Sequence, residues 1–154
     1  MKHLNILLGL TTFILGCNSS IDRNEKLINA INDTTITIRG NIIVLSENDY
    51  RFDYYDVSES DSHSDYLQQE GYQGGGYSWE GIVYGAIKLS EPSILNSIRF
   101  DPEADGLAIW SQDRTSLEKI GRLIAVMKTD DKILIECIIV IIMYHHFPIL
   151  LFSM

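Results

Sequence analysis

The amino-acid sequence predicts an α+β domain, an antiparallel sheet of about four strands covered on one face by two main helices. Two observations carry this prediction. Strand-like segments come in two groups, and an amphipathic helical segment follows each group. The sequence also lacks the glycine-rich βαβ pattern of a dinucleotide-binding parallel sheet. Strands followed by a helix, twice over, are typical of a sheet with helices segregated to one face.

The first group contains two strand segments. Residues 34–46 are rich in β-branched residues at a spacing of two, which predicts one strand or a hairpin bent at Gly40-Asn41. Residues 50–55 alternate aromatic side chains with Arg51, Asp53 and Tyr55, and therefore predict a second strand. The turn between the two segments is expected at residues 47–49.

The first helix is expected to follow Ser78, which is a suitable N-cap residue. It should end near Glu91-Pro92, because proline disfavours a helical conformation of the residue before it. Apolar residues that would share one face of this helix are Trp79, Ile82, Val83, Ala86 and Ile87.

The second group consists of residues 98–100 and 107–110, joined by the turn-forming residues 101–106. These two segments predict a hairpin. Thr115 and Glu118 have the spacing of a capping box, and apolar residues follow at helical intervals to about Lys128. We therefore predict a second amphipathic helix in this part of the chain.

The amino terminus has the pattern of a secretory signal. Lys2 precedes an apolar run over residues 4–15, and Ile14-Leu15-Gly16-Cys17 resembles the lipobox of bacterial lipoproteins. Residues 1–16 are thus expected to be removed, with Cys17 lipidated and holding the protein at a membrane of the cell envelope. If the cell has two membranes, Asn18 in place of aspartate favours the outer membrane over the inner one. The alternative is a signal anchor that contains a cysteine by chance.

Residues 17–33 are mostly polar and predict a tether that lets the domain stand off the membrane, although a short helix is also compatible with the sequence. The globular domain is expected over residues 34–130. Residues 131–154 form an apolar tail with three interpretations: a membrane helix, a buried strand or a disturbed reading frame. Glu136 and Pro148 argue against the membrane helix.

The net charge of −9 disfavours a nucleic-acid partner, because an acidic surface repels phosphates. It favours encounter with a basic protein instead. Only two cysteines are present, so a disulfide framework is not expected if Cys17 is lipidated.

No arrangement of residues indicates catalysis, a cofactor or a metal site. The glycines of residues 71–77 precede a helix, but the Lys-Ser/Thr pair of a phosphate-binding loop is missing and Glu80 would repel phosphate. A sharp turn that lets aromatic residues pack around the helix start explains these glycines better. His145 and His146 have no third ligand in the sequence pattern, and we predict no metal site.

The segment from Glu70 to Glu80, EGYQGGGYSWE, followed by an apolar helix, resembles the signature of the immunity protein 51 family. Residues 100–104, residues 107–111 and Asp113 before the last helix resemble further parts of that family, and the resemblance covers roughly residues 34–130. It implies a protein that binds and neutralises a toxin by occlusion, without catalysis.

The resemblance implies a cognate toxin as partner, which the acidic charge suggests is basic. A toxin-binding surface needs aromatic anchors and complementary charge. An envelope lipoprotein with a structural or ligand-binding role is the alternative function. The candidate partner-binding residues are Glu70, Tyr72, Tyr77, Trp79, Glu80 and Asp101.

Overall fold

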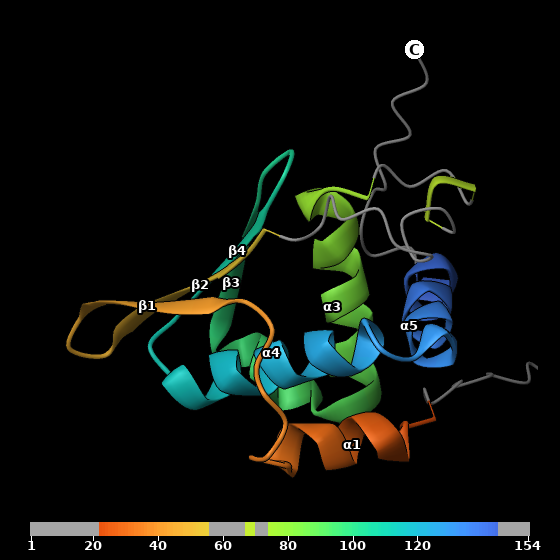
Figure 1. The fold of residues 1–154 in the computed structure, drawn as a ribbon, viewed down its shortest axis with the longest axis horizontal. Coiled ribbons are helices and arrows are strands. Elements are labelled where there is room, and N and C mark those ends of the chain that lie inside the picture. Colours follow the sequence, from red (N-terminus) through yellow and green to blue (C-terminus); the bar gives the residue numbers. More distant parts are fainter. Residues whose placement is uncertain (1–21, 56–66, 70–73, 145–154) are drawn as a thin grey trace, which may run out of the picture.

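The computed structural model of the protein describes residues 22–55, 67–69 and 74–144. These residues form a four-stranded antiparallel sheet with helices packed on one face, so the predicted fold class is confirmed. The strand order is β1-β2-β4-β3, which places β2 and β4 in the centre (Figure 1). The strands are β1 (Asn41–Ser46), β2 (Asp49–Tyr54), β3 (Ile98–Pro102) and β4 (Leu107–Ser111).

The first strand is shorter than the sequence predicted, because residues 34–40 are not part of the sheet. Gly40 has a φ of +115°, and a side chain there would overlap the ring of Phe52. The chain therefore bends at this glycine before it enters the sheet. The turn after β1 is tight, and Asn48 adopts a positive φ of 58° that asparagine tolerates.

Helices α3 (Gly76–Ser90) and α4 (Arg114–Met127) form the layer that covers the sheet, as predicted. The short 3₁₀ helix η2 (Pro92–Asn96) links α3 to β3. Side chains on the covered face of the sheet include Phe52 and Tyr54, which are fully buried. The Tyr54 ring meets the Trp79 ring edge to face, with 5.1 Å between the ring centroids.

Both predicted N-caps are wrong by a few residues. Gly75 is the N-cap of α3, and the Ser78 hydroxyl oxygen instead accepts a hydrogen bond from the backbone N–H of Gly74. Asp113 caps α4, because its carboxylate accepts from the backbone N–H groups of Thr115 and Ser116. Thr115 therefore lies inside the helix.

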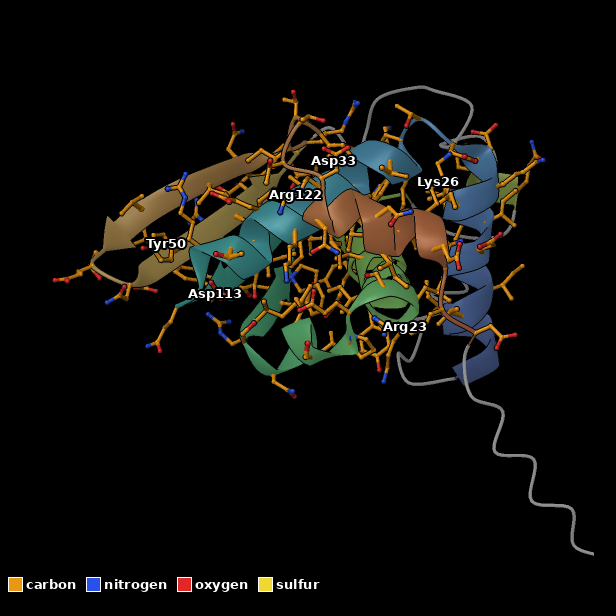
Figure 2. The ribbon with its side chains drawn as sticks, turned by 90° about the horizontal axis from the view of Figure 1, so that it is seen from below. Arg23, Lys26, Asp33, Tyr50, Asp113 and Arg122 are labelled. Atoms are coloured by element: carbon orange, nitrogen blue, oxygen red, sulfur yellow. The ribbon has the colours of Figure 1, made fainter. Side chains whose placement is uncertain are left out.

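The segment predicted as a tether or a short helix contains a packed helix, α1 (Glu25–Asn32). Leu27 and Ile31 are buried against α3 and α4. Figure 2 shows Arg122 of α4 pointing toward α1, where its Nε and Nη2 donate to the backbone oxygen of Ile31 at 3.1 and 2.9 Å. The guanidinium thus satisfies a carbonyl at the negative end of the α1 dipole and ties α1 to α4.

The apolar tail begins with a helix, α5 (Asp131–Tyr144), so the buried-strand interpretation is wrong. This helix packs mainly against α3, and the packed domain continues past residue 130. No helix in the described part of the chain is both long and apolar enough to cross a bilayer. The buried side chains of α5 are Ile133, Leu134, Cys137, Ile138, Val140 and Ile141.

Polar contacts join α5 to α1 at the surface. Asn24 Nδ2 donates to Glu136 Oε2 at 2.5 Å, and Lys26 pairs with Asp130. The backbone N–H of Asn24 also donates to the oxygen of Leu89 at the end of α3. Helices α1 and α5 therefore form an outer layer that lies on α3 and α4, on the side away from the sheet (Figure 1).

Candidate protein-interaction surface

The glycine-rich segment ends at the start of α3, where its backbone lies close to the turn that joins β3 to β4. A Cβ on Gly75 would overlap the backbone oxygen of Ala104, and a Cβ on Gly76 would overlap the oxygens of Glu103 and Gly106. These two glycines are therefore required by the approach of one backbone to another. Their role is to dock α3 against the hairpin.

The candidate residues of this segment lie in different environments. Trp79 is only 1% exposed and serves the core, whereas Tyr77 is 61% exposed beside it in the sequence. Glu80 is partly buried, and desolvation raises the pKa of its carboxyl group above the ordinary value. Glu70 and Tyr72 lie outside the described residues.

Asp101, the remaining candidate, lies in β3 on the face of the sheet opposite to α3 and α4. Its Oδ2 accepts a hydrogen bond of 3.0 Å from the indole Nε1 of Trp110 in β4. Because side chains alternate along a strand, Asp101 and Trp110 point away from the face that carries Phe100 and Ile109. Asp101 is therefore part of a second surface, which we did not predict from the sequence.

That surface has a row of three side chains, one from each of β2, β4 and β3. The register places Arg51 and Arg99 on either side of Trp110. The guanidinium carbons of Arg51 and Arg99 lie 5.6 and 5.3 Å from the centroid of the Trp110 ring, within cation–π range. Arginines on β2 and β3, the two strands that border β4, thus flank one indole.

Carboxylates lie next to this row. Arg51 donates from Nη2 to Asp53 Oδ2 at 2.7 Å, and this hydrogen bond raises the pKa of the Arg51 guanidinium. Asp53 is buried, so it holds the Arg51 guanidinium in a fixed position. Arg99 is held more loosely, because its Nη1 lies 3.8 Å from Asp101 Oδ2.

Tyr55 extends the same surface beyond the end of β2. It is 59% exposed, and its ring lies where a side chain on Gly106 would be. We call Arg51, Tyr55, Arg99, Asp101 and Trp110 the open sheet face. The apolar side chains that β2 and β4 bury, which include Phe52 and Ile109, lie on the opposite face, where α3 and α4 pack.

A shallow depression of about 610 Å³ continues the open sheet face toward the start of α4. Arg99 and Trp110 belong to both. Polar side chains dominate the rest of its lining, which includes Asp49, Asn96, Ser97 and Gln112. The depression therefore joins the arginine–tryptophan row to polar side chains near the start of α4.

The described residues give no grouping of three His, Cys, Asp or Glu side chains suited to a metal ion, and His145 and His146 lie outside them. Cys137 is buried in α5, and burial raises the pKa of its thiol far above the ordinary value. A thiol held in the protonated form is a poor nucleophile.

Comparison with known protein families identifies the chain as an immunity protein. Residues 43–140 match the immunity protein 51 family, and the chain belongs to this family. The family resemblance of the sequence is thereby confirmed, and the match continues well into α5 rather than ending before it. No curated protein and no solved structure matches the chain.

Proposed function

We propose that this protein binds a cognate toxin and neutralises it by occlusion, without catalysing a reaction. The observation that carries the proposal is the family match, which covers the sheet except for the first two residues of β1, together with α3, α4 and most of α5. The open sheet face supports it, because tryptophan, tyrosine and arginine are the residues that contribute most to protein–protein binding energy. A rigid sheet backed by two layers of helices holds these side chains in place.

The charge of the chain supports a basic toxin as partner. The net charge is −9, and removal of residues 1–16, which contain Lys2 and no acidic residue, would leave −10. Long-range attraction between oppositely charged proteins raises the rate of encounter. We therefore expect association of the toxin with this protein to slow steeply as ionic strength rises.

The lipid anchor at Cys17 is the second part of the proposal, and it would hold the protein at a membrane of the cell envelope. Helix α1 is packed and begins at Glu25, eight residues after Cys17 in the sequence. Eight extended residues span at most roughly 29 Å. An anchored molecule would thus keep its domain close to the bilayer surface.

The proposal predicts a toxin gene beside the gene of this protein, and co-expression of the two tests the immunity function. Cells that produce both proteins should survive, and the purified proteins should form a one-to-one complex. Equal killing with and without this protein would overturn the proposal. A lipoprotein that is exported and anchored but gives no protection would support the alternative envelope role.

Incorporation of radiolabelled palmitate tests the anchor independently of any toxin. The wild-type chain and a Cys137→Ser variant should both be labelled, because Cys137 is buried in α5. A Cys17→Ser variant should take up no label and should stay with the signal peptide uncleaved by the lipoprotein peptidase. Absence of label from the wild type, when a known lipoprotein is labelled, would rule out the anchor.

A further inference from the structure

We propose that the open sheet face is the surface that receives the toxin, and that Arg99 binds a side-chain carboxylate of the toxin there. This assignment rests on the proposed toxin-binding function. The assignment does not rest on the net negative charge of the molecule, because the row of Arg51 and Arg99 is locally cationic. The partner chemistry is thus an acidic residue on a protein that is basic overall.

The first argument is the difference between the two arginines of the row. Arg51 has an exposed side-chain fraction of 33% and is engaged by Asp53 at 2.7 Å. Arg99 is 64% exposed, and its nearest carboxylate oxygen, on Asp101, lies 3.8 Å away, beyond hydrogen-bond distance. Within the described ranges its guanidinium makes no shorter polar contact, so its donors are open to a partner.

The second argument is that Arg99 is positioned before a partner arrives. Trp110 lies under its guanidinium, and the Trp110 indole is itself fixed by the hydrogen bond to Asp101. An arginine stacked on a ring presents its N–H groups in the plane of the guanidinium, which suits bidentate binding of a carboxylate. Less side-chain entropy is then lost on binding.

The third argument is charge complementarity across the face. Arg51 and Arg99 lie in one row, and Asp53 and Asp101 lie two residues further along the same strands. A partner that presents an acidic group to the first row and a basic group to exposed Asp101 would match both. Such a pattern fixes the register of a complex and excludes proteins with uniform charge.

The test measures the affinity of the purified mature chain for the neighbouring toxin, inactivated so that it can be produced. Arg99→Glu should weaken binding by at least about tenfold, since it sets a carboxylate against a carboxylate. Trp110→Ala should weaken it by a similar factor, because the platform for Arg99 is lost. Lys132→Glu is the matched control: it makes the same change of charge on an exposed residue of α5.

The outcomes separate the surface from the function. If the wild type binds and Arg99→Glu and Trp110→Ala bind equally well, this surface assignment is wrong and the toxin-binding function stands. If Lys132→Glu weakens binding as much as Arg99→Glu, the effect is one of overall charge and the assignment also fails. A wild-type chain that neither binds nor protects overturns the function itself. Arg99→Glu should keep the thermal unfolding midpoint of the wild type, because its side chain is mostly exposed.

Discussion

Gly85 of α3 lies directly against the backbone of Cys137 in α5, so closely that a Cβ at position 85 would overlap the Cys137 carbonyl oxygen. One turn earlier in α3, Gly81 faces Ile141, and a Cβ there would lie 3.1 Å from the Ile141 Cδ1 atom. Two glycines of α3 thus contact α5. Gly85 lies against backbone atoms, and Gly81 lies against the end of a side chain. The difference predicts different tolerance to alanine.

Gly85→Ala should lower the free energy of unfolding by about 1–3 kcal/mol, because α5 must move away and its buried side chains lose contact. Gly81→Ala should be close to neutral, since the Ile141 side chain can rotate and alanine favours a helix by up to about 1 kcal/mol. Urea unfolding of the two variants measures the difference. Equal midpoints would show that α5 is not packed on α3 at Gly85.

Gly76→Ala should destabilise the domain by at least about 2 kcal/mol, because the new Cβ would meet two backbone oxygens of the β3–β4 turn. Gly74→Asn is the control, since Gly74 has open space around it and a φ of +76° that asparagine tolerates. Thermal unfolding of both variants tests the docking of α3. If Gly76→Ala unfolds at the same temperature as Gly74→Asn, the docking contact is absent.

Asp113→Ala should destabilise the protein by about 1 kcal/mol at neutral pH, because the backbone N–H groups of Thr115 and Ser116 lose their acceptor. A hydrogen bond from the Ser116 hydroxyl is the largest cause that lowers the pKa of Asp113 below 3.8. The stability that the ionised Asp113 carboxylate contributes is therefore present above pH 3.8 and is lost as pH falls through the lowered pKa. Urea unfolding at several pH values measures this contribution.

Comparison with Asp113→Asn isolates the charge, because asparagine keeps an acceptor for the cap but does not titrate. The stability advantage of the wild type over Asp113→Asn should shrink as the solution is acidified below pH 3.8. An advantage that stays constant down to pH 2 would contradict the assigned hydrogen bonds.

Glu80→Gln should stabilise the protein at neutral pH. Burial raises the pKa of Glu80 above 4.5, so its ionised form is disfavoured in the folded state. The stability that the protonated Glu80 carboxyl contributes is fully present below pH 4.5 and is lost as pH rises through the raised pKa. The gain from Glu80→Gln should therefore vanish in acid. Glu47→Gln, in the exposed turn after β1, is the control and should not stabilise the protein at either pH. Urea unfolding at neutral and acid pH measures the stability of both variants. Equal changes in stability for Glu80→Gln and Glu47→Gln would disprove the burial effect.

The sequence predicted β2, the β3–β4 hairpin, α3 and α4 because each carries its own local pattern of alternation or helical periodicity. A helix at α5 was only one of three interpretations of the apolar tail, and then as a membrane helix, for a physical reason. Its residues are apolar around most of the helix, so no periodicity distinguishes it, and its run of β-branched residues favours a strand. Packing against Gly81 and Gly85 decides the helix, and those contacts are distant in the sequence.

The candidate surface was predicted only at Asp101. The alternation in β2 already put Arg51 and Tyr55 on the opposite face from Phe52, which was the available signal. What the sequence could not supply is the strand order, in which β4 lies between β2 and β3. Only that order brings Arg51 and Arg99 to the two sides of Trp110.

The outer helical layer, in which Asn24 and Lys26 of the α1 region contact Glu136 and Asp130, determines how the molecule can be attached to a support. The chain enters the described domain at the start of α1, on the far side from the sheet (Figure 1). A linker attached at that point therefore lies on the opposite side of the domain from the sheet. Capture of the protein on a sensor chip through its amino-terminal end should leave Trp110 and its arginines accessible to a soluble analyte.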